Sequence, residues 1–147
     1  MKNVFKPLGI VAAVAAVTAG YSGVTNAQER SIGNTGDLAI IPYYTVQDDW
    51  VTGVHITNTS NFTRVVKLRL RRGSDSADAM DFNLVMSPYD MWTGFIDDSS
   101  GDIVFATQDT TCTAPVLPGG KATMPGIFRN GAEEGYIEVI PMGRTID

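Results

Sequence analysis

The 147-residue chain has few of the residues from which catalytic sites are usually built. It contains one histidine, His55, and one cysteine, Cys112. Zinc sites need several such ligands, and a Cys–His pair requires that the fold bring these two residues together. The chain also lacks a G-x-S-x-G motif, a P-loop and the carboxylate spacing of a glycosidase. We therefore expect a protein that is not an enzyme and that needs no cofactor.

Long apolar runs are scarce as well. The one example, Leu8–Gly20, is shorter than the roughly 20 apolar residues that a membrane span needs. It follows Lys2 and Lys6, and it precedes the small residues of Thr25–Ala27. This pattern predicts a cleaved secretory signal over residues 1–27, with an uncleaved N-terminal anchor as the alternative. After cleavage we expect no membrane span, and a location in the periplasm, on the outer surface or outside the cell.

Positive charge is also in short supply. The formal net charge is −5, and loss of the two signal lysines leaves 9 basic against 16 acidic residues, or −7. A domain of this charge is a poor binder of nucleic acid, so we expect no nucleic-acid partner. Residues 28–147 are enough for one domain with one hydrophobic core.

The single cysteine is unusual in an exported chain, where disulfides can form. Three explanations remain open for Cys112: a bridge to another molecule, a tolerated thiol, or a disulfide partner that is missing from this sequence. The last β-rich segment, 135–140, enters a turn shortly before the sequence stops. This favours the third explanation and suggests an N-terminal fragment of a longer protein.

Once the signal is set aside, no segment shows the 3.6-residue period of an amphipathic helix. Short β-rich segments recur about every ten residues instead, with turn residues between them. The pattern predicts an all-β antiparallel β-sandwich, with an open barrel or a jelly roll as the alternative. We expect residues 108–129 to be irregular. The expected strands are 37–46, 50–57, 64–71, 80–86, 91–96, 103–107 and 135–140.

Two of these segments alternate clearly. In 64–71 one face is apolar (Val66, Leu68 and Leu70) and the other is basic. In 50–57 the inward positions would be Trp50, Val54 and Ile56. The link 58–63 is rich in Asn, Thr and Ser, and its two Asn-x-Ser/Thr sequences are better explained as turn chemistry than as glycosylation acceptors. We therefore expect an antiparallel hairpin with one buried face.

Two further turn features follow from proline. Ser87–Asp90 has Ser first and Pro second, which predicts a type I turn between two antiparallel strands. Pro42 lies inside segment 37–46, and proline cannot donate to a strand ladder. This segment should therefore be an edge strand or contain a bulge.

The run "DDSSGD" provides one candidate metal site. Oxygen ligands at alternating positions beside a glycine can hold calcium, which makes Asp97, Ser99 and Asp102 the candidate ligands. The run lacks the full EF-hand pattern, and a plain turn is the alternative.

A line of basic residues provides a candidate binding surface. Alternate side chains of a strand lie about 7 Å apart on one face, which suits an acidic polysaccharide, a lipid phosphate or the acidic face of another copy. The alternative is a hydrated sheet face that discourages aggregation. The residues concerned are Arg64, Lys67, Arg69, Arg71 and Arg72.

Aromatic residues could form a platform on which sugars stack. The candidates are Tyr43, Tyr44, Trp50, Tyr89 and Trp92. Trp50 shares the parity of the buried positions, so the core is the expected place for it.

The runs "VHITNTSNFTRVVKLRLR" and "FNLVMSPYDMW" resemble immunoglobulin-like modules of exported bacterial proteins. With "PYYTV", "CTAP" and "EGYIEV", the chain is most similar to a group of uncharacterised exported proteins of Gram-negative bacteria. The resemblance covers nearly all of residues 28–147, and it implies an immunoglobulin-like β-sandwich. Members of the group are longer than this chain, and they bring no catalytic residues to carry over.

These observations predict an exported, non-catalytic structural or interaction module at the cell surface or in the periplasm. The alternative is a carbohydrate- or calcium-binding adhesion module. The expected partners are a protein, a polysaccharide or a second copy of the chain.

Overall fold

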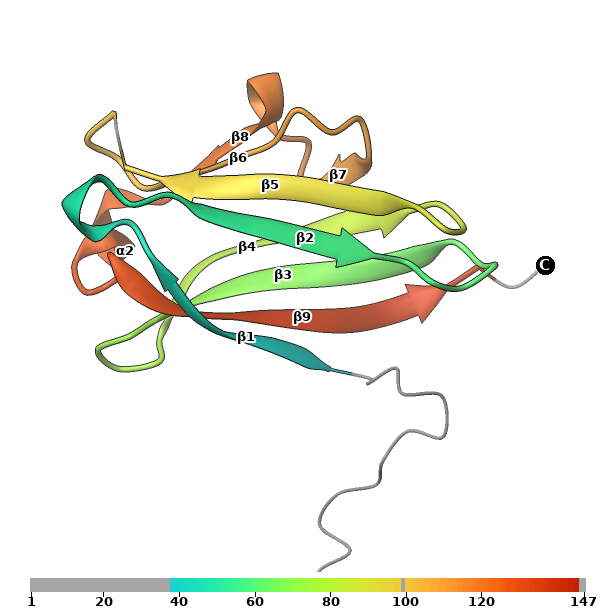
Figure 1. The fold of residues 1–147 in the computed structure, drawn as a ribbon, viewed down its shortest axis with the longest axis horizontal. Helices are drawn as coiled ribbons and strands as arrows, with labels where there is room; N and C mark the ends of the chain where they lie inside the picture. The colour runs from blue at the N-terminus through green and yellow to red at the C-terminus, as the bar shows by residue number, and fades with distance from the viewer. Residues whose placement is uncertain (1–37, 99, 146–147) are drawn as a thin grey trace, which may run out of the picture. The chain divides into compact units, whose positions relative to one another are not determined.

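Two packed antiparallel sheets make up the part of the protein that this computed structural model describes, residues 38–98 and 100–145 (Figure 1). The predicted all-β sandwich is confirmed at this level. The expected signal segment 1–27 lies outside the described residues. The first sheet has the strand order β1-β9-β3-β4-β7, and the second has the order β2-β5-β6-β8.

The predicted strands are all present, with shifted ends. The first sheet contains β1 (Ala39–Thr45), β3 (Arg64–Arg72), β4 (Asp78–Met86), β7 (Cys112–Ala114) and β9 (Glu134–Arg144). The second sheet contains β2 (Thr52–Thr57), β5 (Met91–Asp97), β6 (Val104–Ala106) and β8 (Lys121–Thr123). Three short helical segments are η1 (Gln47–Asp49), η2 (Pro118–Gly120) and α2 (Gly126–Arg129).

The prediction that residues 108–129 are irregular was wrong. This stretch contains β7, β8 and α2, of three, three and four residues. A strand of three residues is too short to show alternation, so the sequence carries no periodic signal for it.

The core lies between the two sheets, and β3 supplies its expected apolar face. Leu68 and Leu70 are fully buried and Val66 is nearly so. An aromatic cluster joins the sheets, because Phe82 on β4 meets Phe105 on β6 and Trp92 on β5 at ring-centroid distances of 5.2 and 6.0 Å. Edge-to-face contacts of this kind are favourable beyond the apolar area that they bury.

The expected hairpin of β2 with β3 was wrong. β2 pairs with β5 in the second sheet, and β3 pairs with β4 and β9 in the first. The link 58–63 therefore crosses from one sheet to the other. A buried apolar face on each strand is compatible with either arrangement, so alternation alone cannot separate a hairpin from a crossover.

The charges of β3 explain its choice of neighbours. Arg69 lies opposite Asp81 on β4 and Glu138 on β9, and Arg71 lies opposite Asp78 on β4. Lys67 lies opposite Asn83 but contacts Asp81 on β4. The outward positions of β2 are Gly53, His55 and Thr57, none of which is acidic. Because opposite charges across strands are favourable, β4 and β9 are better partners for β3.

Asn58 fixes the crossover of β2 to β3. Its side-chain amide donates to the carbonyl oxygens of Phe62 (2.8 Å) and Ser87 (2.7 Å), with a longer contact to Met86 (3.4 Å). Its Oδ1 accepts from the N–H and the hydroxyl of Ser60 at 3.1 and 2.7 Å. The turn chemistry expected for this asparagine is confirmed, and it reaches a second segment of the chain as well.

That second segment is the crossover of β4 to β5. The expected turn at Ser87–Asp90 is closed by Asp90 N–H donating to Ser87 C=O at 3.2 Å. It is not a type I turn, because Tyr89 at its third position has a φ of 58°. The strands on its two sides belong to different sheets, so it does not close a hairpin either. Backbone bonds from Asn58 N–H to Asp90 C=O and from Tyr89 N–H to Ser60 C=O join the two crossovers.

β1 is an edge strand with a bulge, as Pro42 predicted. It lies at the end of the first sheet, and its register against β9 shifts between Ile41 and Tyr44. Tyr44 is fully buried, and its hydroxyl donates to the carbonyl oxygen of Ala132 at 3.0 Å. Burial, reinforced by the nearby Glu133 carboxylate, raises the pKa of Tyr44 to about 12. The ring therefore anchors the edge strand in its neutral form.

We predict that Asn58→Ala lowers the free energy of unfolding by about 2–4 kcal/mol. The substitution removes the amide donor of part-buried carbonyl oxygens in both crossovers, Phe62 and Ser87, and it leaves the Ser60 hydroxyl without its acceptor on Asn58. The loss of such hydrogen bonds costs about 1–3 kcal/mol for each group that stays unpaired. Asn61→Ala is the matched control, because Asn61 lies in the same link and is exposed; it should change stability by no more than about 0.5 kcal/mol. Urea unfolding of both variants measures the difference, and equal effects would contradict the role given to Asn58.

Candidate functional site

The predicted core position of Trp50 was wrong. Trp50 precedes β2, and 67% of it is exposed to solvent. The ladder of β2 with β5 begins at Thr52, so Trp50 lies two residues beyond the paired part of the sheet. It directly follows a turn in which Asp48 and Asp49 have left-handed φ values of 52° and 64°. Aspartate tolerates this conformation better than most side chains.

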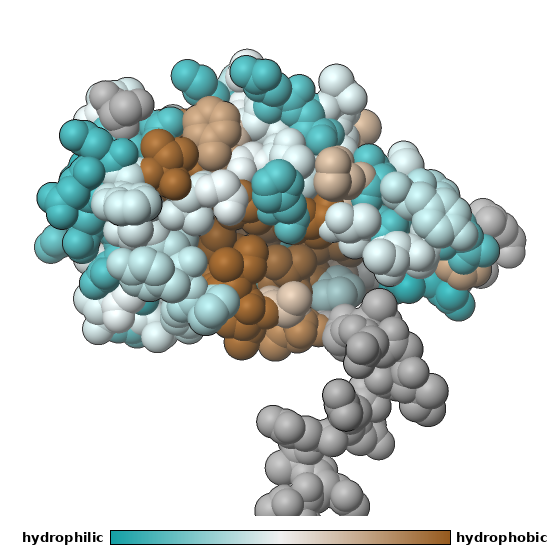
Figure 2. Space-filling view, in the orientation of Figure 1, coloured by the Kyte–Doolittle hydropathy of each residue, from teal (hydrophilic) through white to brown (hydrophobic). Residues whose placement is uncertain are grey.

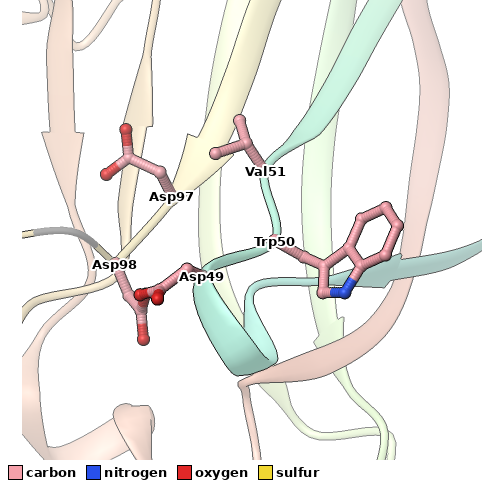
Figure 3. A pocket seen from close by; sticks show the side chains of 5 residues that line it. All are labelled: Asp49, Trp50, Val51, Asp97 and Asp98. Carbon is pink, nitrogen blue, oxygen red and sulfur yellow. The ribbon is translucent and has the colours of Figure 1, made fainter.

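A small pocket of about 40 Å³ lies beside Trp50. It is lined by Asp49, Trp50, Val51, Asp97 and Asp98, from the connection of β1 to β2 and from the end of β5 (Figure 3). The carboxylates of Asp49 and Asp98 lie close together, while the Trp50 ring points away from them (Figure 3). The ring and the carboxylates are therefore two neighbouring features of one surface.

The short helix α2 adds to this surface. Its Arg129 guanidinium lies 3.7 Å from an oxygen of Asp98 and 3.7 Å from an oxygen of Glu133. Its Ile127 is 81% exposed, and Val51 beside Trp50 is 55% exposed. We call this region the Trp50 end; it comprises Asp49, Trp50, Val51, Asp97, Asp98, Ile127 and Arg129.

Two of the three candidate calcium ligands lie within the described residues. Asp97 ends β5, Asp102 is exposed in the following loop, and Ser99 lies outside the described residues. Within residues 38–98 and 100–145, no group of three His, Cys, Asp or Glu residues is placed to hold a metal ion. The calcium site stays a prediction.

The aromatic platform does not form as a single surface. Trp92 and Tyr44 are fully buried and belong to the core. Trp50, Tyr43 and Tyr89 are exposed, at 67%, 57% and 70%. Tyr89 lies in the turn between β4 and β5 and Trp50 in the connection of β1 to β2, so the exposed rings come from different loops.

The basic line on β3 is paired with acidic residues. Lys67 contacts Asp81 at 2.7 Å, and Arg72 pairs with Asp75 in the turn after β3. Arg71 lies 2.7 Å from Asp78 and 3.1 Å from Glu138. Arg69 is also paired, at 3.4 Å from Asp78 and 3.8 Å from Glu138. The last basic residue of the line, Arg64, donates from its Nε to the Ser60 hydroxyl.

This pairing changes how the basic line is interpreted. A polyanion would compete with carboxylates already held by Lys67, Arg69 and Arg71. The side chains of these three cations and of Arg72 are only 20–26% exposed. The contacts favour the alternative of a hydrated sheet face, and polyanion binding stays a prediction.

Cys112 and His55 lie on different sheets. Cys112 is an exposed free thiol on β7, at one edge of the first sheet. His55 is exposed on β2, at one edge of the second sheet. A disulfide from Cys112 to a partner beyond this sequence stays a prediction.

We predict that Arg71→Met lowers the free energy of unfolding by about 1–2 kcal/mol. Glu138 has a side chain only 18% exposed, and it would lose its closest cation. Lys121→Met on β8 is the control, because Lys121 is exposed; its effect should stay within about 0.5 kcal/mol. Guanidinium chloride would screen this pairing, so the measurement uses urea. A loss no larger than that of the control would show that the pairing adds nothing to stability.

None of the helical segments in residues 38–98 and 100–145 has the length and apolar character needed to cross a membrane. Comparisons of the chain with protein-family models, curated proteins and solved structures found no match.

Proposed function

We propose that the chain is an exported, non-catalytic interaction module that works at the cell surface or in the periplasm. The observation that carries this proposal is the exposure of Trp50, with Val51 and Ile127 exposed on the same Trp50 end. Tryptophan is the residue type most enriched among the side chains that dominate binding energy. An indole ring that is 67% exposed adds little to the core of the fold.

The surroundings of the ring support a protein partner. The Trp50 end contains three carboxylates, and its cation Arg129 is held between Asp98 and Glu133. Apolar side chains surrounded by charged groups are the usual composition of a protein-binding surface. Acidic groups at the rim of an interface mainly affect partner choice and association rate.

The proposal includes an immunoglobulin-like architecture in a broad sense. Two antiparallel sheets packed face to face, with a buried tryptophan on a central strand, support it. The strand order is not that of an antibody domain, because β1 neighbours the last strand, β9, and not the next one. The likeness is therefore to the sandwich architecture and not to its detailed topology.

A carbohydrate- or calcium-binding adhesion module is the second candidate. Trp50 and the carboxylates of Asp49 and Asp98 favour it, since sugar rings stack on indole rings and sugar hydroxyl groups donate hydrogen bonds to carboxylates. The direction of the ring, away from the carboxylates, means that one sugar unit would not reach both (Figure 3).

The test is photo-crosslinking in the cell envelope. We expect benzoylphenylalanine at position 50 to give a discrete protein adduct, and the same group at the exposed position 121 of β8 to give none. With the partner identified, Trp50→Ala should weaken binding by about 2 kcal/mol, or roughly 30-fold.

Two results would contradict the protein-binding proposal. One is an equal yield of adducts at positions 50 and 121. The other is wild-type binding to purified cell-surface polysaccharide that Trp50→Ala abolishes, which would favour the second candidate.

A further inference from the structure

The edge of β1 is the least protected sheet edge among the described residues. β7 and β8 are edge strands of only three residues, and β8 begins with Lys121. β2 presents Gly53, His55 and Thr57 outward, which offer little apolar surface. β1 has no charged residue; its Ile40 is 56% exposed, and Leu38, the residue before it, is 51% exposed. Natural edge strands usually carry a charge, a proline or a bulge that prevents pairing with another chain, and in β1 the proline and the bulge both come after Ile41.

The second half of the β1 edge is closed. The Thr52 hydroxyl donates to the carbonyl oxygen of Thr45 at 2.8 Å and accepts from its N–H at 3.1 Å. Pro42 has no N–H to offer, and the bulge lies between Ile41 and Tyr44. These three features leave only the first residues of the strand open to a new neighbour.

The direction of the open backbone groups follows from the register. Val46 N–H donates to Glu133 C=O on the β9 side, whereas Thr45 turns to Thr52. Backbone direction alternates along β9, so Ile137 and Val139 face β1 and bond to Ile41 and Ala39. Ile40 therefore directs its N–H and C=O groups to the free edge, and Leu38 would do the same if the strand were extended by one residue.

The apolar surface continues beside this edge. Figure 2 shows a broad apolar area in the middle of the face where Figure 1 places β1 and β2. Three partly buried residues packed against the core, Ile41, Ile56 and Val139, lie on β1, β2 and β9. An apolar area of this kind on a strand edge marks an interaction site.

We propose that the first residues of β1 pair antiparallel with the same residues of a second copy of this chain. In the register that centres the two-fold axis on Ala39, Leu38 lies opposite Ile40 of the second copy, and Ile40 lies opposite its Leu38. The pairing extends β1 by one residue, to Leu38, so that both pairs exchange N–H and C=O bonds, and neither needs the missing N–H of Pro42. The apolar side chains of both pairs lie on one face, where cross-strand packing is favourable.

Two features make a second copy the fitting occupant. At the two-fold axis, Ala39 of one copy would face Ala39 of the other as a non-hydrogen-bonded pair. The Cα atoms of such a pair lie about 4.5 Å apart, which suits a small side chain. The strand is uncharged, so an identical strand brings no charge that would be buried without a partner. The contact is short, so the dimer is weak and forms in a concentration-dependent way. This inference rests on the proposed interaction function and names one partner for it.

The first experiment measures the association of the purified protein by sedimentation velocity. We expect the average mass to rise with protein concentration towards that of a dimer. Ile40→Lys should raise the dimer dissociation constant about tenfold or more, because two lysines would meet Leu38 across the axis. Ile127→Lys, at an even more exposed position of the Trp50 end, should leave it unchanged. Thermal unfolding confirms that both variants are folded.

The second experiment tests the register. In a Cys112→Ser background, Ala39→Cys should form an intermolecular disulfide, since the Cα separation of a non-hydrogen-bonded pair suits one. Ile127→Cys is the control and should stay reduced under the same oxidation. Cross-linking no faster at position 39 than at position 127 would overturn the proposal.

The remaining outcomes also decide the question. A protein that is monomeric at every concentration would overturn self-pairing, and an adduct at position 50 would still support the proposed function. If the protein is monomeric and benzoylphenylalanine at position 40 captures a different polypeptide, the edge accepts a foreign strand and the proposal is wrong.

Discussion

The hydrogen bonds of one side chain, Asn58, determine how the two sheets are connected. Its amide and its Oδ1 reach the link after β2 and the turn after β4, and backbone bonds join the same two segments. Both segments cross between the sheets at one end of the sandwich. A buried amide can satisfy so many polar groups only when both crossovers are in place, so the same bonds that stabilise them also select against a β2–β3 hairpin.

This connection places β3 in the middle of the first sheet, and its charges follow from that position. The cations Lys67, Arg69 and Arg71 meet carboxylates of β4 and β9 that a hairpin with β2 would not supply. The outer face of this sheet is therefore nearly balanced in charge. Among the exposed apolar side chains, Trp50 and Ile127 lie at the Trp50 end and Ile40 lies on the open part of β1, and we assign interactions to those two surfaces.

The sequence predicts the local features of this fold well and the long-range ones poorly. Alternation in 64–71 correctly identified the buried face of β3, and Pro42 correctly indicated a bulged edge strand. Alternation does not say which strand lies beside which, because a crossover and a hairpin bury the same residues. The exposure of Trp50 was missed because the alternation in the sequence continues back to Trp50, although the paired part of β2 begins only at Thr52. The Asn-Thr-Ser run at Asn58 was the one local signal of the crossover, and its partners at 86 and 87 lie too far along the chain for a sequence pattern to reveal.

Nuclear Overhauser contacts between backbone protons test the connection of the sheets most directly. The account predicts contacts between β2 and β5, with His55 opposite Thr93, and contacts of Lys67 on β3 with Asn83 on β4 and Ile140 on β9. It predicts no backbone contacts between β2 and β3. A ladder of contacts between β2 and β3 would contradict the crossover at Asn58 and with it the arrangement of both sheets.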